Sequence, residues 1–118
     1  MTEKEFWGFL EQRGKTNMVL VDNASGDGAV DIAQEFISGH ALLPKDYDNL
    51  TEEEIESISG LLFQKNIEKK TKEAILILLA HQISDVALTS LKKFNLNPDK
   101  ELIYFARFAL DESLMWNE

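Results

Sequence analysis

The stretch Ala74-Ile75-Leu76-Ile77-Leu78-Leu79-Ala80 decides the fold class of this 118-residue chain. Seven consecutive apolar residues are typical of a buried strand or of a buried helix. Charged and polar residues on both sides extend the unit to residues 72–83, which is longer than most strands, and Leu and Ala favour the helix. We therefore predict a helix over 72–83 that is buried on all sides.

Start signals for further helices lie on both sides of this stretch. The segment Thr51-Glu52-Glu53-Glu54 has the capping-box pattern, and Thr2 and Glu5 repeat it. The pair Asn97-Pro98 indicates another start, with Asn97 as N-cap. The sequence predicts six helices, over residues 3–13, 29–38, 52–65, 72–83, 86–94 and 98–116, and a short extended segment over 18–21.

We therefore expect an all-α fold of five or six helices in one domain spanning residues 1–118. Residues 1–50 form its irregular N-terminal part and residues 51–118 a helical stack. The last three predicted helices have short connections, which make consecutive helices antiparallel neighbours.

Residues 74–112 contain an apolar pattern that is found in paired helices. It consists of Leu78-Leu79, Asp85 at a turn, and Val86-Ala87-Leu88 with Leu91, followed by a fainter copy over 105–110. The pattern resembles the HEAT-like family of α-helical repeats. This resemblance implies helix pairs stacked in a right-handed array whose concave face usually binds another protein. The alternative is an irregular helical bundle without repeats.

Composition excludes several classes of function. The formal net charge is −9, which repels phosphate backbones, so we expect no nucleic-acid partner. The chain has no Cys and two His, so we expect no cofactor and no metal site. No apolar stretch is long enough to cross a membrane, and the first residues lack a signal-peptide pattern, so we expect a cytoplasmic protein without a membrane partner.

No catalytic motif is present in the sequence. It contains neither a Gly-x-Ser-x-Gly elbow, nor a phosphate-binding loop, nor a Glu-x-x-His pair. Residues 23–34 are similar to a calcium loop, but Gln34 stands where the bidentate Glu is needed, so we interpret them as a turn followed by an N-cap. His81 is interpreted as a partly buried residue bonded to a nearby carbonyl or hydroxyl. We therefore expect no enzymatic activity.

Two sets of residues are candidates for an interaction site. On the helix predicted over 98–116, one face is expected to pack on the two preceding helices, and it consists of Leu102, Ala106, Ala109, Leu110 and Trp116. Tyr104, Phe108 and Met115 lie roughly opposite, and they either pack inside the domain or form an interaction surface. The second set is Glu52, Glu53 and Glu56, which either match the helix dipole or form an acidic face for a basic partner.

These features indicate a small acidic interaction module that binds another protein or a second copy of itself in a homodimer. An acidic inhibitor of the immunity type, which blocks a basic partner, is the alternative.

Overall fold

The computed structural model describes residues 1–12 and 50–117 and confirms the all-α fold. The described helices are α1 (Glu3–Gln12), α3 (Glu52–Leu62), α4 (Lys69–Ala80), α5 (Asp85–Leu96), the short 3-10 helix η3 (Lys100–Leu102) and α6 (Ile103–Asn117). The predictions of a helix over 29–38, an extended segment over 18–21 and a turn within 23–34 fall outside the described residues. The division of the domain at residue 50 therefore stays a prediction.

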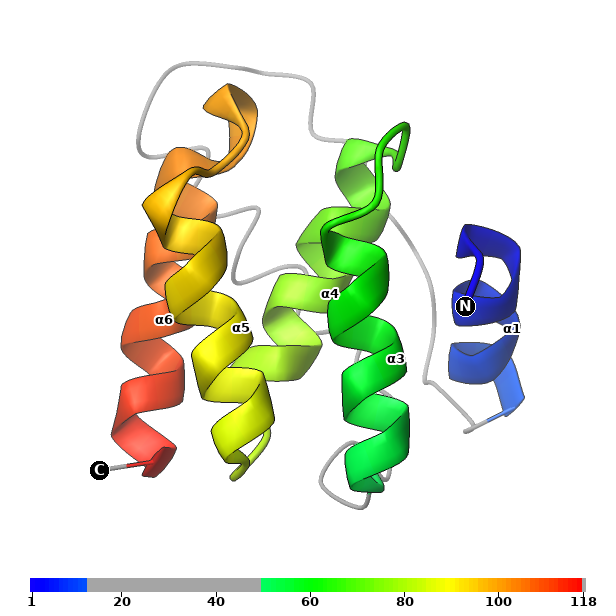
Figure 1. Ribbon diagram of the computed structural model, residues 1–118, viewed down its shortest axis with the longest axis horizontal. Helices are drawn as coiled ribbons and strands as arrows, with labels where there is room; N and C mark the ends of the chain where they lie inside the picture. The colour runs from blue at the N-terminus through cyan, green and yellow to red at the C-terminus, as the bar shows by residue number, and fades with distance from the viewer. Residues whose placement is uncertain (13–49, 118) are drawn as a thin grey trace.

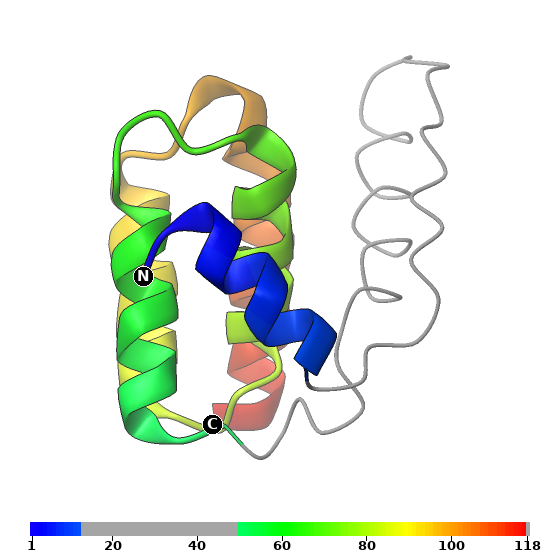
Figure 2. The same cartoon turned by 90° about the vertical axis from the view of Figure 1, so that its right-hand side faces the viewer.

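Helices α3 to α6 form two layers. Helices α3 and α5 lie side by side in one layer, and α4 and α6 lie side by side in the other (Figures 1 and 2). Successive helices run in opposite directions, so the arrangement consists of two adjacent helical hairpins, α3–α4 and α5–α6. Helix α1 covers the α3–α4 hairpin on the side away from α5 and α6 (Figure 2).

Helix α4 is the centre of the core, as the sequence predicts. All seven residues from Ala74 to Ala80 are buried, with at most 4% of each residue exposed. Helix α4 packs against α3, α5 and α6, and the buried Phe6 and Leu10 of α1 belong to the same apolar cluster. A helix surrounded in this way needs apolar residues on every face, which explains the unbroken apolar run.

The two predicted capping boxes are present. Thr51 Oγ1 accepts a hydrogen bond from the Glu54 amide at 3.1 Å, and the Glu54 carboxylate accepts one from the Thr51 amide at 2.8 Å. The same reciprocal pair joins Thr2 and Glu5 at the start of α1. These bonds satisfy amide groups that a helix start leaves without intrahelical partners.

Several predicted helix ends are wrong. Helix α3 ends at Leu62 rather than residue 65, because the chain turns at Asn66, whose φ of 63° lies in the left-handed region. Helix α4 begins at Lys69 and ends at Ala80, so Ile83 lies in the connection to α5 and not in the helix. The Ser84 hydroxyl accepts from the Ala87 amide and starts α5 at Asp85.

The predicted start of the last helix at Asn97-Pro98 is also wrong. Helix α5 continues to Leu96, and Asn97 is its C-cap rather than an N-cap. Pro98 lies in the connection, and the next turn starts at Asp99, whose carbonyl accepts from the Leu102 amide at 2.9 Å. This bond closes η3, and α6 follows from Ile103.

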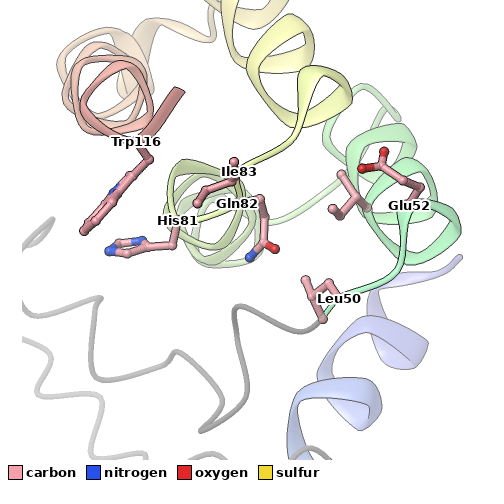
Figure 3. A pocket seen from close by; sticks show the side chains of 7 residues that line it. Leu50, Glu52, His81, Gln82, Ile83 and Trp116 are labelled. Atoms are coloured by element: carbon pink, nitrogen blue, oxygen red, sulfur yellow. The ribbon is translucent and has the colours of Figure 1, made fainter. Parts of the chain in front are cut away.

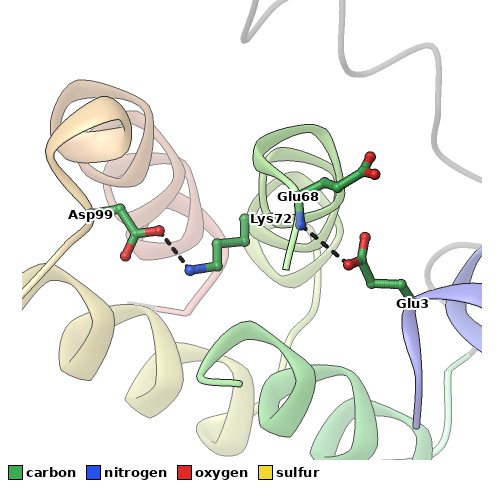
Figure 4. Close-up of polar contacts among 4 residues, drawn as sticks. All are labelled: Glu3, Glu68, Lys72 and Asp99. Carbon is green, nitrogen blue, oxygen red and sulfur yellow. Dashed lines mark hydrogen bonds and ion pairs between the residues drawn. The ribbon is translucent and has the colours of Figure 1, made fainter. Parts of the chain in front are cut away.

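A set of polar side chains, which we call the clasp, surrounds the N-terminal end of α4. The clasp consists of Glu3, Trp7, Thr71, Lys72 and Asp99. The Glu3 carboxylate accepts from the Glu68 amide at 3.2 Å and from the Thr71 hydroxyl at 2.5 Å, and that hydroxyl accepts from the Trp7 indole at 3.1 Å. On the other side, Lys72 Nζ lies 2.6 Å from Asp99 Oδ2 (Figure 4).

The clasp explains how α4 starts without a cap of its own. Glu68 occupies the N-cap position, but its side chain makes no capping hydrogen bond. The Glu3 carboxylate of α1 instead accepts from the Glu68 backbone amide, as the N3 Glu does in a capping box, and places a negative charge at the positive end of the α4 dipole.

Candidate functional site

A pocket of about 240 Å³ lies at the opposite end of α4, and we treat it as the candidate site. Its walls come from the start of α3, the end of α4 with the connection to α5, and the last turn of α6. The lining residues are Leu50, Glu52, Ile55, His81, Gln82, Ile83 and Trp116. In Figure 3, His81 and Trp116 lie on one side, Leu50 and Glu52 on the other, and Gln82 and Ile83 between them.

The connection between α4 and α5, which forms part of the pocket wall, is held by hydrogen bonds with Asn117. The Asn117 amide group donates to the carbonyl of Gln82 at 3.0 Å, and its oxygen accepts from the backbone amide of Ser84 at 3.1 Å. Gln82 is itself buried and donates to the Leu78 carbonyl at 3.0 Å. The connection between α4 and α5 is therefore fixed to α6, and Ile83 is carried on a constrained backbone.

The His81 ring is fixed by the end of α4. Its Nδ1 lies 2.9 Å from the Ile77 carbonyl, which confirms the predicted bond to a nearby carbonyl. Because a carbonyl only accepts, Nδ1 carries the proton of this bond. Nε2 faces the Glu112 carboxylate at 3.3 Å, and the ring centroid lies 6.4 Å from that of Trp116.

Glu52 supplies the acidic group of the pocket. The Ser84 hydroxyl donates to its Oε2 at 3.3 Å, which is long for a hydrogen bond between oxygens. This is the only side-chain partner that Glu52 has among the residues that the structure describes. The residue is exposed, so its charge faces both the pocket and the surrounding water.

Large apolar side chains stand exposed around the pocket. Ile83 is 79% exposed, Met115 77% and Trp116 50%. The prediction that Trp116 faces the core is wrong. The helical spacing is correct, but α4 ends at Ala80, so the last turn of α6 meets the α4–α5 connection instead of a helix.

The structure separates the apolar residues that the sequence nominates. Tyr104 is 57% exposed at the start of α6, whereas Met115 lies near its end, about 16 Å away along the helix axis. Phe108 lies between them, half-buried against the core. Tyr104 and Met115 thus face away from the core but do not line one pocket, and neither belongs to the walls described above.

The nominated acids are divided as well. Glu52 lines the pocket, whereas Glu53 and Glu56 are exposed on α3 outside it. The sequence reasoning missed Leu50, Gln82 and Ile83 as site residues. Ile83 carried a usable signal, since it stands alone between the polar pairs His81-Gln82 and Ser84-Asp85.

Charge is distributed unequally between the two ends of the helical layers. We call the pocket end the acidic end, because residues 50–57, 81–87 and 110–117 contain seven Asp or Glu and no Lys or Arg. Residues 63–72 and 92–101 meet at the other end and contain seven Lys and three Asp or Glu. The negative ends of the α4 and α6 dipoles meet the positive ends of the α3 and α5 dipoles there, so the dipoles offset one another and the charge of this end comes from its side chains.

The polar side chains at the pocket are engaged by other groups of the chain. The Ser84 hydroxyl is engaged as the cap of α5, and His81 contacts a carbonyl and a carboxylate rather than a nucleophile. Over residues 1–12 and 50–117, no group of three or more His, Asp or Glu is placed to hold a metal ion. No helix in this part of the chain has the length and apolarity needed to cross a membrane.

Comparison with models of protein families found no match to this chain. Comparisons with curated proteins and with solved structures found no match either.

Proposed function

We propose that the chain is a small acidic protein-interaction module that uses the acidic end of its helical layers to bind another protein. The observation that carries this proposal is the exposed position of Ile83 on a backbone held by Asn117, next to the half-exposed Trp116. An exposed aliphatic residue contributes little to stability, and aromatic residues and Met are enriched in protein interfaces. A fixed apolar rim loses little conformational entropy when a partner covers it.

The two-layer arrangement supports the proposal of a HEAT-like stack. Helices α3 and α5 lie in one layer, and α4 and α6 in the other, so the two hairpins are placed like neighbouring units of an α-helical repeat. In such stacks the concave face usually binds another protein.

A pair of matched variants tests the interaction role. Ile83 and Leu96 are both highly exposed aliphatic residues, at 79% and 86%, but they lie at opposite ends of α5. A photo-crosslinking amino acid is placed at position 83 or 96 of the full chain, and the protein captured at position 83 is identified and purified. Its affinity is then measured for the natural chain, for Ile83→Ser and for Leu96→Ser.

We expect Ile83→Ser to raise the Kd at least about tenfold, as at a central interface residue, and Leu96→Ser to leave it unchanged. Equal effects of the two substitutions would contradict an interface at the acidic end. Absence of any capture at position 83, with the fold intact by circular dichroism, would contradict the interaction role itself.

An acidic inhibitor of a basic partner is the second candidate function, and the seven acids of the acidic end favour it. Charge complementarity of this kind accelerates association at low salt. Association rates measured with the purified partner distinguish the inhibitor from the interaction module. An association rate that falls steeply between low and physiological ionic strength, together with loss of the partner's activity, supports the inhibitor. An association rate that does not change with salt concentration supports the interaction module without inhibitor activity.

A further inference from the structure

We propose that the pocket receives a single arginine side chain from a basic segment of the partner. This inference rests on the proposed interaction role and names the chemistry of the partner. It starts from size, because the pocket holds about 240 Å³ and small-molecule sites usually hold about 300–1,000 Å³. One long side chain fits such a volume, whereas a nucleotide-sized cofactor does not.

The two walls of the pocket differ in the way that an arginine requires. Trp116 and His81 form an aromatic wall on one side, and Ile83 lies between this wall and Glu52 on the other side (Figure 3). An arginine that enters over Trp116 places its apolar stem along Ile83 and its guanidinium at the Glu52 carboxylate. Long cationic side chains bury apolar stems while their charged ends remain polar, and a guanidinium also stacks on aromatic faces.

Glu52 is able to accept this guanidinium. Within the described residues, its carboxylate accepts one side-chain hydrogen bond, the long one from Ser84. The other acceptor positions of the two carboxylate oxygens can therefore take a donor from a ligand. A guanidinium offers two parallel N–H donors that match a carboxylate.

The charge of the whole acidic end favours a basic occupant over an apolar or acidic one. The three segments that meet there hold seven acids and no Lys or Arg. A second copy of the chain would have to place its own basic end here. That arrangement is head-to-tail and predicts rings or open-ended self-association.

The two tryptophans provide a direct test, because Trp116 lines the pocket and Trp7 belongs to the clasp at the other end of α4. Their indole N–H signals are followed in proton–nitrogen correlation spectra of the full chain. The probes are three blocked tripeptides, acetyl-Ala-X-Ala-amide, in which X is arginine, neutral citrulline or apolar norleucine. Each is titrated into the millimolar range.

We expect the arginine peptide to move the Trp116 signal and to leave the Trp7 signal in place. The citrulline peptide should bind at least about tenfold more weakly, since it lacks the charge-assisted contact. Glu52→Gln should weaken the arginine peptide by a similar factor. Glu53→Gln removes the same charge from an exposed position outside the pocket and should change the Kd less than about twofold.

Several results would overturn the inference. Equal affinities for the norleucine and arginine peptides would mean that the pocket binds any apolar side chain. Equal effects of Glu52→Gln and Glu53→Gln would indicate general electrostatic attraction to the acidic end instead of a direct contact with Glu52. Movement of the Trp116 signal with protein concentration alone would make a second copy the occupant. If no peptide moves this signal while Ile83→Ser still weakens the purified partner, the arginine site fails and the interaction role stands.

Discussion

The two ends of α4 differ in how their side chains are placed: buried polar groups have internal partners at one end, and large apolar side chains are exposed at the other. At the N-terminal end, the clasp gives the Thr71 hydroxyl and the Lys72 ammonium partners from other elements of the same chain. At the C-terminal end, Ile83 and Trp116 stand exposed beside a pocket, and acids gather without Lys or Arg. The first end is built for stability, because its buried polar groups are satisfied internally. At the second end, we expect the exposed Ile83 and Trp116 to contribute little to stability.

The largest test of this difference compares one aromatic residue from each region. Phe6 of α1 is completely buried, so Phe6→Ala should lower the free energy of unfolding by about 3–5 kcal/mol. Trp116 is 50% exposed, and Trp116→Ala should cost less than about 1 kcal/mol. Urea denaturation of both variants measures the two values. A cost for Trp116→Ala close to that of Phe6→Ala would assign the pocket end to the stabilising core.

A second test concerns the carboxylate that caps α4 from α1. Glu3→Ala removes the acceptor for the Glu68 amide and the Thr71 hydroxyl, so we expect a loss of about 2 kcal/mol in the free energy of unfolding. Glu11 is exposed on the same helix, and Glu11→Ala should stay within about 0.5 kcal/mol. Equal values for the two variants would mean that the clasp does not stabilise α4.

The ion pair of the clasp gives a third, smaller effect. The Lys72 side chain is 11% exposed and that of Asp99 47%. Asp99→Ala leaves the Lys72 charge without this partner, but because Asp99 is half in water we expect about 1–2 kcal/mol rather than the roughly 3–5 kcal/mol of a fully buried pair. Lys72→Met removes the buried charge itself and should change stability by less than about 1 kcal/mol. A larger loss for Lys72→Met would show that the pair is a net stabilising contact.

The sequence predicted the parts of this fold that depend on local signals. The apolar run over 74–80 identified the central helix, because a helix buried on all sides needs no polar face. The capping boxes at Thr2 and Thr51 were predicted correctly, because their hydrogen bonds join residues three positions apart.

Features that depend on tertiary contacts were not predicted. Glu3 and Thr71 of the clasp are 68 positions apart, and no periodicity connects them. Trp116 was predicted to face the core but is half-exposed, because helical spacing gives the direction of a side chain and not where the neighbouring helix ends. The pocket was missed for the same reason, since its walls come from helix ends that meet only in the folded chain.

The smallest expected effect is the pH dependence of the α1 capping box. The backbone N–H of Thr2 donates to the Glu5 carboxylate at 2.9 Å, and this bond, with a smaller contribution from the Thr2 side chain, lowers the pKa of Glu5 below its usual value of 4.5. The contribution of the ionised Glu5 carboxylate to the free energy of unfolding is therefore complete above pH 4.5, and it is lost as the pH falls through the lowered pKa of the folded state.

Glu5→Gln separates the charge from the hydrogen bond, because Gln keeps an accepting oxygen at this position and does not titrate. We expect the stability difference between the natural chain and Glu5→Gln to be small, to favour the natural chain above pH 4.5, and to decrease below it. Urea denaturation at a series of pH values measures this difference. A difference that stays constant through the acid range would show that the Glu5 charge does not contribute to the start of α1. The attachment of α1 would then depend on Phe6, Leu10 and the Glu3 carboxylate at the clasp.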